Sequence, residues 1–175
     1  MACDLTSGFN DRLCADGKGG IKSMVILVLD EIDSITVVAN EVTALTQLLP
    51  NQGYYYQLRS NLSSYTSSPR RNEENGTTWY DQTLNVVLNS DTKELRAEID
   101  LILKNLCVML IEKADGTFVL LGMNDGLYMS DGSENTSGVT REDRNGHTLS
   151  FVGTESLALP DVASIVAAVL IADAA

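Results

Sequence analysis

Short runs of β-branched and apolar residues, separated by turn-forming residues, recur along the chain, and this rhythm most constrains its fold. The longest run, Thr77–Leu88, alternates in polarity with the period of two that a β-strand gives. Asp115-Gly116 supplies a tight turn between two other runs, which is typical of a hairpin. Because helical and strand patterns do not alternate, we predict a mainly β (α+β) fold, an antiparallel β-barrel or sandwich. The predicted strands lie in Ile21–Leu29, Ile35–Ala39, Gly53–Arg59, Thr77–Leu88, Cys107–Lys113, Thr117–Met123 and His147–Gly153.

One segment, at about residues 90–105, has the pattern of an amphipathic helix. Ser90 or Asp91 is suited to cap it, and Glu94 is close enough to complete a capping box. The helix needs a sheet or barrel to cover, because its apolar residues recur at spacings of three and four. This stripe comprises Leu95, Ile99, Ile102, Leu103 and Leu106.

The length and charge of the chain limit the classes of protein to which it can belong. Its 175 residues suffice for one domain with its own core, and we predict a single domain over residues 1–175. The apolar tail at about 162–175 is too short for a bilayer-spanning helix, so we expect no membrane association. With 24 acidic and 12 basic residues the net charge is −12. Nucleic-acid binders are usually basic, so this charge indicates either solubility alone or a surface that faces DNA without holding it.

A long polar segment at about residues 59–76 carries almost no core-forming pattern. Such a loop is either a floppy insertion or an arm that orders on a neighbouring subunit. Arg70-Arg71 is followed at once by Glu73-Glu74, which favours salt bridges at a subunit contact over phosphate binding. The candidate residues of this arm are Arg59, Tyr65, Pro69, Arg70, Arg71, Glu73, Glu74 and Trp79.

The apolar run Ile21–Leu29 is typical of a strand that is buried on both faces or paired edge to edge with a partner. We predict an inter-subunit strand here, with Ile21, Val25 and Leu27 as its candidate residues.

The sequence contains no G-x-S-x-G, P-loop or G-x-G-x-x-G motif and no pair of histidines. His147 is the single histidine, and its place after Asn145-Gly146 predicts a solvent-exposed turn residue. The segments Asn124–Gly126 and Ser130–Asn135 offer oxygen ligands of the kind that calcium binds, but polar turns use the same residues. We therefore expect no enzyme, no cofactor and no metal site, and keep a calcium-dependent binding module as an alternative.

Several of these elements together resemble the tail-tube proteins of long-tailed phages, which are related in fold to the type VI secretion tube protein. The resemblance rests on a Gly19-Gly20 entry into the first strand, a polar loop, and Glu74-Asn-Gly-Thr-Thr-Trp-Tyr-Asp-Gln82 leading a strand. The helix, the Asp115-Gly116 hairpin and a closing strand Asp143–Glu155 follow, with the pattern D-x-N-G-h-x-L-x-F-x-G-x-E.

The resemblance implies a structural virion protein, a tail tube subunit that forms stacked rings, with six copies per ring and an acidic channel for DNA passage. Its partners would be copies of itself and other tail or neck proteins, with DNA passing through without specific binding. The implied place is the virion tail, assembled in the cytoplasm of the bacterial host. A capsid decoration or cement protein and a head-tail connector remain alternative interpretations.

Overall fold

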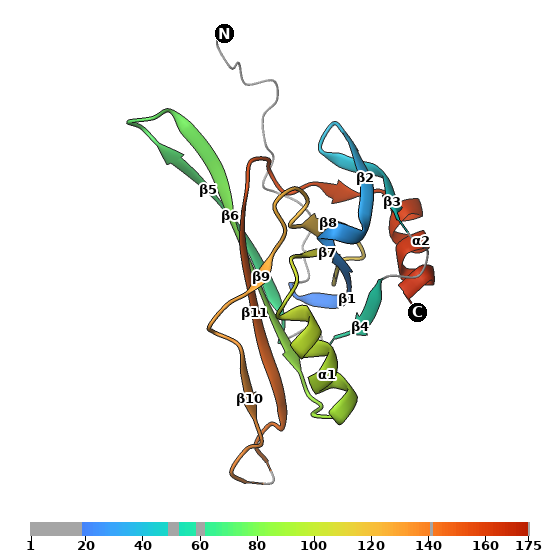
Figure 1. Cartoon of the computed structure of the whole chain (residues 1–175), viewed down its shortest axis with the longest axis vertical. Helices are drawn as coiled ribbons and strands as arrows, with labels where there is room; N and C mark the ends of the chain where they lie inside the picture. The colour runs from blue at the N-terminus through green and yellow to red at the C-terminus, as the bar shows by residue number, and fades with distance from the viewer. Residues whose placement is uncertain (1–18, 49–52, 59–61, 141, 175) are drawn as a thin grey trace.

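Two β-sheets form most of the computed structural model, which describes residues 19–48, 53–58, 62–140 and 142–174 (Figure 1). The larger sheet has seven strands in the order β2-β3-β12-β8-β7-β1-β4. These are β1 (Ile21–Val28), β2 (Ile32–Val38), β3 (Glu41–Gln47), β4 (Tyr54–Gln57), β7 (Cys107–Lys113), β8 (Phe118–Leu121) and β12 (Asp161–Val162). All its pairings are antiparallel except that of β3 with β12.

The smaller sheet has the order β10-β11-β6-β5, and a short strand, β9, also pairs with β11. Its strands are β5 (Ser64–Asn72), β6 (Thr77–Leu88), β9 (Tyr128–Met129), β10 (Glu134–Thr136) and β11 (Gly146–Glu155). A 3-10 turn, η1 (Leu29–Glu31), and two helices, α1 (Lys93–Ile102) and α2 (Ser164–Ala174), complete the described elements. The prediction of a mainly β sandwich is confirmed, and the described strands do not close into a barrel.

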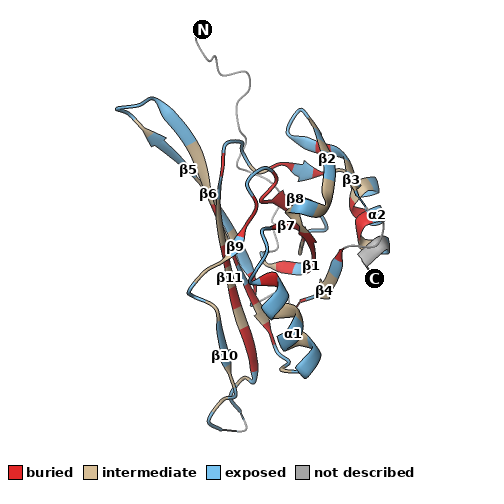
Figure 2. Ribbon diagram, viewed as in Figure 1, coloured by how far each residue is buried: buried red, intermediate tan, exposed pale blue. Residues whose placement is uncertain are grey.

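The central strands β1, β7 and β8 of the larger sheet are mostly buried (Figure 2). One hydrophobic cluster lies on each face of these strands. Strand β7 shows why, because Met109 and Ile111 belong to the cluster shared with the smaller sheet, whereas Val108 and Leu110 face α2. A continuous apolar run is the pattern expected of such a strand. The molecule is therefore layered as smaller sheet, larger sheet and helix α2.

Helix α1 begins at Lys93, within the predicted segment. Its cap is Thr92, whose hydroxyl accepts the N–H of Leu95, and not Ser90 or Asp91. Leu95, Ile99 and Ile102 of the predicted apolar stripe pack in the cluster between the sheets, whereas Leu103 and Leu106 are exposed. The second helix was not predicted, and it turns the apolar tail into α2, which packs Ala167 and Leu170 on the larger sheet. No helix in the described residues is long and apolar enough to cross a membrane.

The prediction of a long polar loop at about 59–76 is wrong over most of its length. Residues 64–72 form β5, which pairs with β6 along its whole length from Ser64↔Asn85 to Asn72↔Thr77. Backbone pairing to a strong neighbouring strand outweighs the polar side chains, because ladder hydrogen bonds do not depend on residue type.

Candidate assembly surfaces

The β5–β6 hairpin extends beyond the sandwich at one end of the long axis (Figure 1). Strand β11 accompanies β6 only as far as the pair Glu155↔Tyr80. Past that point no other described strand pairs with the hairpin, and its residues are mostly exposed (Figure 2). We call residues 69–80 the arm.

A polar cluster on one face stiffens the arm. Trp79 lies directly across from Arg70, and Asp81 follows two residues later on the same face. The Asp81 carboxylate accepts a hydrogen bond from Arg70 Nε at 2.8 Å and another from Trp79 Nε1 at 2.9 Å. Arg70 is thus paired within its own subunit, with Asp81 rather than with Glu73 or Glu74, and the predicted salt bridges at a subunit contact stay a prediction.

The other predicted arm residues divide into two groups. Tyr65 is half-buried at the root of the hairpin and packs against the core, where burial raises the pKa of its hydroxyl. Pro69, Arg71, Glu73 and Glu74 are exposed on the arm itself. A proline is tolerated here because β5 is an edge strand and one of its sides needs no donor. Arg59 lies outside the described residues.

Strand β1 is not the exposed inter-subunit strand that the apolar run predicted. It is paired with β4 on one side and β7 on the other. Ile21, Val25 and Leu27 are buried, and their side chains fill the two hydrophobic clusters. Of the two interpretations of the run, burial on both faces is the correct one.

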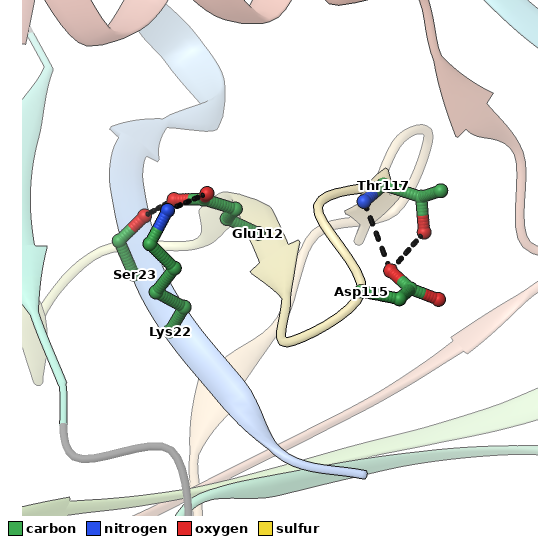
Figure 3. A network of polar contacts seen from close by, with 5 residues as sticks. All are labelled: Lys22, Ser23, Glu112, Asp115 and Thr117. Atoms are coloured by element: carbon green, nitrogen blue, oxygen red, sulfur yellow. Dashed lines mark hydrogen bonds and ion pairs between the residues drawn. The ribbon is translucent and has the colours of Figure 1, made fainter. Parts of the chain in front are cut away.

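A polar network holds the start of β1 to β7 (Figure 3). The Glu112 carboxylate accepts hydrogen bonds from Lys22 Nζ and Ser23 Oγ, both at 2.5 Å. Burial alone raises the pKa of this carboxyl, but the bonds from Lys22 and Ser23 outweigh it, so the pKa is lowered. Nearby, Asp115 closes the β7–β8 turn by accepting from the backbone N–H and hydroxyl of Thr117.

Strands β2 and β4 stand at opposite ends of the larger sheet, and each has an open edge, beside which no described strand lies. Strand β2 has seven residues and ends at Val38, which is 58% exposed. Strand β4 has four, beginning with Tyr54. Unpaired N–H and C=O groups along such edges are a template for another strand.

A groove with a volume of about 380 Å³ lies between α1 and the β9–β10 segment. Its apolar lining comprises Ile99, Leu103, Met129 and Leu149. Asp131 and Glu134 lie at its polar side, and both are exposed. Within the described part of the chain, neither carboxylate takes part in a hydrogen bond or an ion pair.

His147 is buried at the end of this groove, so the prediction of a solvent-exposed turn residue is wrong. Its Nε2 lies 3.1 Å from Asp91 Oδ1. The same oxygen forms an ion pair with Arg96 Nε at 2.9 Å. Burial alone raises the pKa of Asp91, but the bond to His147 and the charge of Arg96 outweigh it and lower the pKa. The cluster ties the start of α1 to β11 and leaves Asp91 unavailable as the helix cap.

The Asn124–Gly126 segment, one of the two considered for calcium, is held by a carboxylate of the same chain. Glu155 is buried and accepts the backbone N–H groups of Asn124 and Asp125, together with the Asn124 side-chain amide. This carboxylate therefore serves to close the Asn124–Gly126 loop. No group of three or more metal-ligating side chains occurs in the part of the chain that the structure describes.

Comparisons with known proteins do not identify a family for this chain. No family model matches the sequence, and no curated protein matches it. Among solved structures, a chain of "Virion of native gene transfer agent (GTA) particle" aligns with a TM-score of 0.34 and 10% identity. The alignment covers 77% of this chain and 97% of that chain. A TM-score at this level does not establish a shared fold, and we draw no functional conclusion from it.

Sequence reasoning missed the open edge of β2 and the groove. Residues Ile35–Ala39 were predicted as a strand, but neighbours in a sheet follow only from the fold. The groove is lined by residues from α1, β9, β10 and β11, and local sequence patterns do not predict that these elements lie side by side.

Proposed function

We propose that the chain is a structural subunit of a phage tail tube, which assembles into stacked rings around a channel for DNA. The observation that carries the proposal is the pair of open edges, β2 and β4, at the two ends of the larger sheet. Neither strand contains proline, lysine or arginine, which block pairing at the edges of many monomeric proteins, although β2 carries one charged residue, Asp33, at a register shift.

Pairing β2 of one copy with β4 of the next extends the larger sheet from subunit to subunit. The two edges are different surfaces, so the contact is heterologous, and repeating it closes a ring when the rotation is right. The ring would then have a continuous sheet around its channel. The sequence resemblance to phage tube proteins implies six copies per ring. It implies no catalytic residue and no cofactor.

The arm and the net charge fit this role. The exposed hairpin of residues 69–80, which extends past the last pair of β6 with β11, supports a contact between neighbouring rings. A net charge of −12 per chain repels DNA phosphates at short range, within a Debye length of about 8 Å in physiological salt. DNA would slide through without being held. We place the assembly in the virion tail, built in the host cytoplasm beside other tail and neck proteins.

Lysines on the β2 edge test the ring contact. Thr36 and Val38 are exposed on β2, so a Thr36→Lys/Val38→Lys variant should fold but lose lateral pairing. A matched control is Asn85→Lys/Thr154→Lys, which adds the same charge to exposed positions of interior strands. Sedimentation velocity should give monomers for the first variant and wild-type assemblies for the second. Equal assembly of both variants would contradict the proposed edge pairing.

A further inference from the structure

The arm and the groove lie apart along the molecule's long axis. The arm extends past one end of the sandwich, whereas the groove lies between α1 and β10 towards the other (Figure 1). Two different surfaces placed in this way cannot meet within one chain. They can meet between copies in a head-to-tail contact, which continues from copy to copy without closing.

The groove has the chemistry of an arginine receptor. Its lining from α1, β9 and β11 is apolar, and its polar side carries the carboxylates of Asp131 and Glu134. An arginine buries its aliphatic stem on apolar surface and keeps its guanidinium at the rim. The planar guanidinium also matches carboxylates in paired, bidentate geometry.

The arm carries a cation that is free to act in this way. Four described cations, Lys22, Arg70, Arg96 and Lys104, are held by acids of their own subunit. The Arg71 side chain is exposed and makes no hydrogen bond or ion pair with any described residue. In the β5–β6 ladder it lies opposite Thr78, on the face away from Arg70 and Trp79. Copies that each carry a charge of −12 need such cations at their contacts, because their acids repel.

We propose that the groove between α1 and β9–β10 receives Arg71 from the arm of a second copy, which pairs there with Asp131 and Glu134. This inference rests on the proposed function, since it assigns the contact by which one ring stacks on the next. Glu73 and Glu74 in the turn of the arm oppose the contact, because they bring like charge towards the same rim. Their neutralisation should strengthen stacking, and Arg71→Lys should weaken it.

Charge reversal with rescue tests the assignment. Arg71→Glu and the double variant Asp131→Arg/Glu134→Arg each place like charges at the contact. All three positions are exposed, so both variants should keep the wild-type circular dichroism spectrum. Each should form rings but lower the stacked fraction in electron micrographs by roughly tenfold or more. The combined triple variant restores opposite charges and should stack again.

The outcomes separate the two proposals. Loss of stacking in both reversals with recovery in the triple variant supports the contact. Unchanged stacking in Arg71→Glu, or loss without recovery in a folded triple variant, overturns it while leaving ring formation intact. Wild-type rings that never stack also overturn it. A wild-type chain that forms no rings overturns the proposed function itself, and this contact with it.

Discussion

The side-chain oxygen Oε1 of Gln82 accepts the backbone N–H of Gly122 at 2.9 Å. Gln82 belongs to β6 of the smaller sheet, and Gly122 follows β8 of the larger one, so this buried bond joins the two layers. A buried polar group must be hydrogen-bonded, and a single bond of this kind fixes how the sheets register against each other.

Replacing Gln82 by leucine should therefore destabilise the fold. The substitution keeps a side chain of similar size but leaves the Gly122 N–H without an acceptor, at a cost of about 1–3 kcal/mol. Urea denaturation gives the free energy of unfolding. Asn85→Ala, at an exposed position of the same strand, is the control and should change stability by less than about 0.5 kcal/mol. Equal stability of Q82L and the wild type would show that the bond between Gln82 and Gly122 does not stabilise the fold.

The Glu112 carboxylate should make stability depend on pH. Its pKa in the folded chain is lowered from the ordinary 4.5, so its contribution is complete above that value and is lost as pH falls through the lower, folded-state pKa. Glu112→Gln should therefore destabilise the chain at pH 7 and differ less from the wild type at pH 3. Denaturation curves at both pH values measure this. Glu73→Gln, in the exposed turn of the arm, is the control, and a Glu112→Gln penalty that grows on acidification would contradict the prediction.

Gly146 should tolerate no side chain. A Cβ at this position would lie 2.0 Å from the carbonyl oxygen of Leu88, where β11 meets the end of β6. Gly146→Ala should separate the strands and cost about 1–3 kcal/mol in unfolding free energy. Gly132→Ala is the matched control, because its Cβ would meet nothing closer than the Ser150 Cβ, at an ordinary 3.4 Å. A thermal melt of G146A equal to that of G132A would show that the strands accommodate the methyl group.

Ala39 offers a stabilising change. It stands in the two-residue turn between β2 and β3 with a φ of 53°, in the left-handed region that disfavours residues with a Cβ. Ala39→Gly should raise the unfolding free energy by about 0.5–1 kcal/mol. Ala44→Gly, in extended β3 backbone, should lower it instead, so the two variants are expected to move the melting temperature in opposite directions.

The sequence predicts an element correctly where its polarity pattern and its turn residues indicate the same structure. Thr77–Leu88 forms β6 with the predicted bounds, since its alternation matches the burial of Leu84, Val86 and Leu88 on one face. Asp115-Gly116 closes the predicted hairpin, with Gly116 at positive φ. The β2–β3 turn was missed because Ala39-Asn40 lacks the usual glycine.

Features that depend on distant partners could not be predicted from local patterns. Strand β5 is polar and becomes a strand only because β6 lies beside it. His147 is buried beside Asp91, which lies 56 residues away along the chain. The apolar run at β1 fits either an interface or an interior strand, and only the pairing with β4 and β7 decides between them.

Self-assembly is the central claim, and negative-stain electron microscopy of the purified full-length chain over a range of concentrations tests it most directly. We predict rings with a central hole that stack into short tubes as concentration rises. A single monomeric species at every concentration, with neither rings nor tubes, would contradict the account.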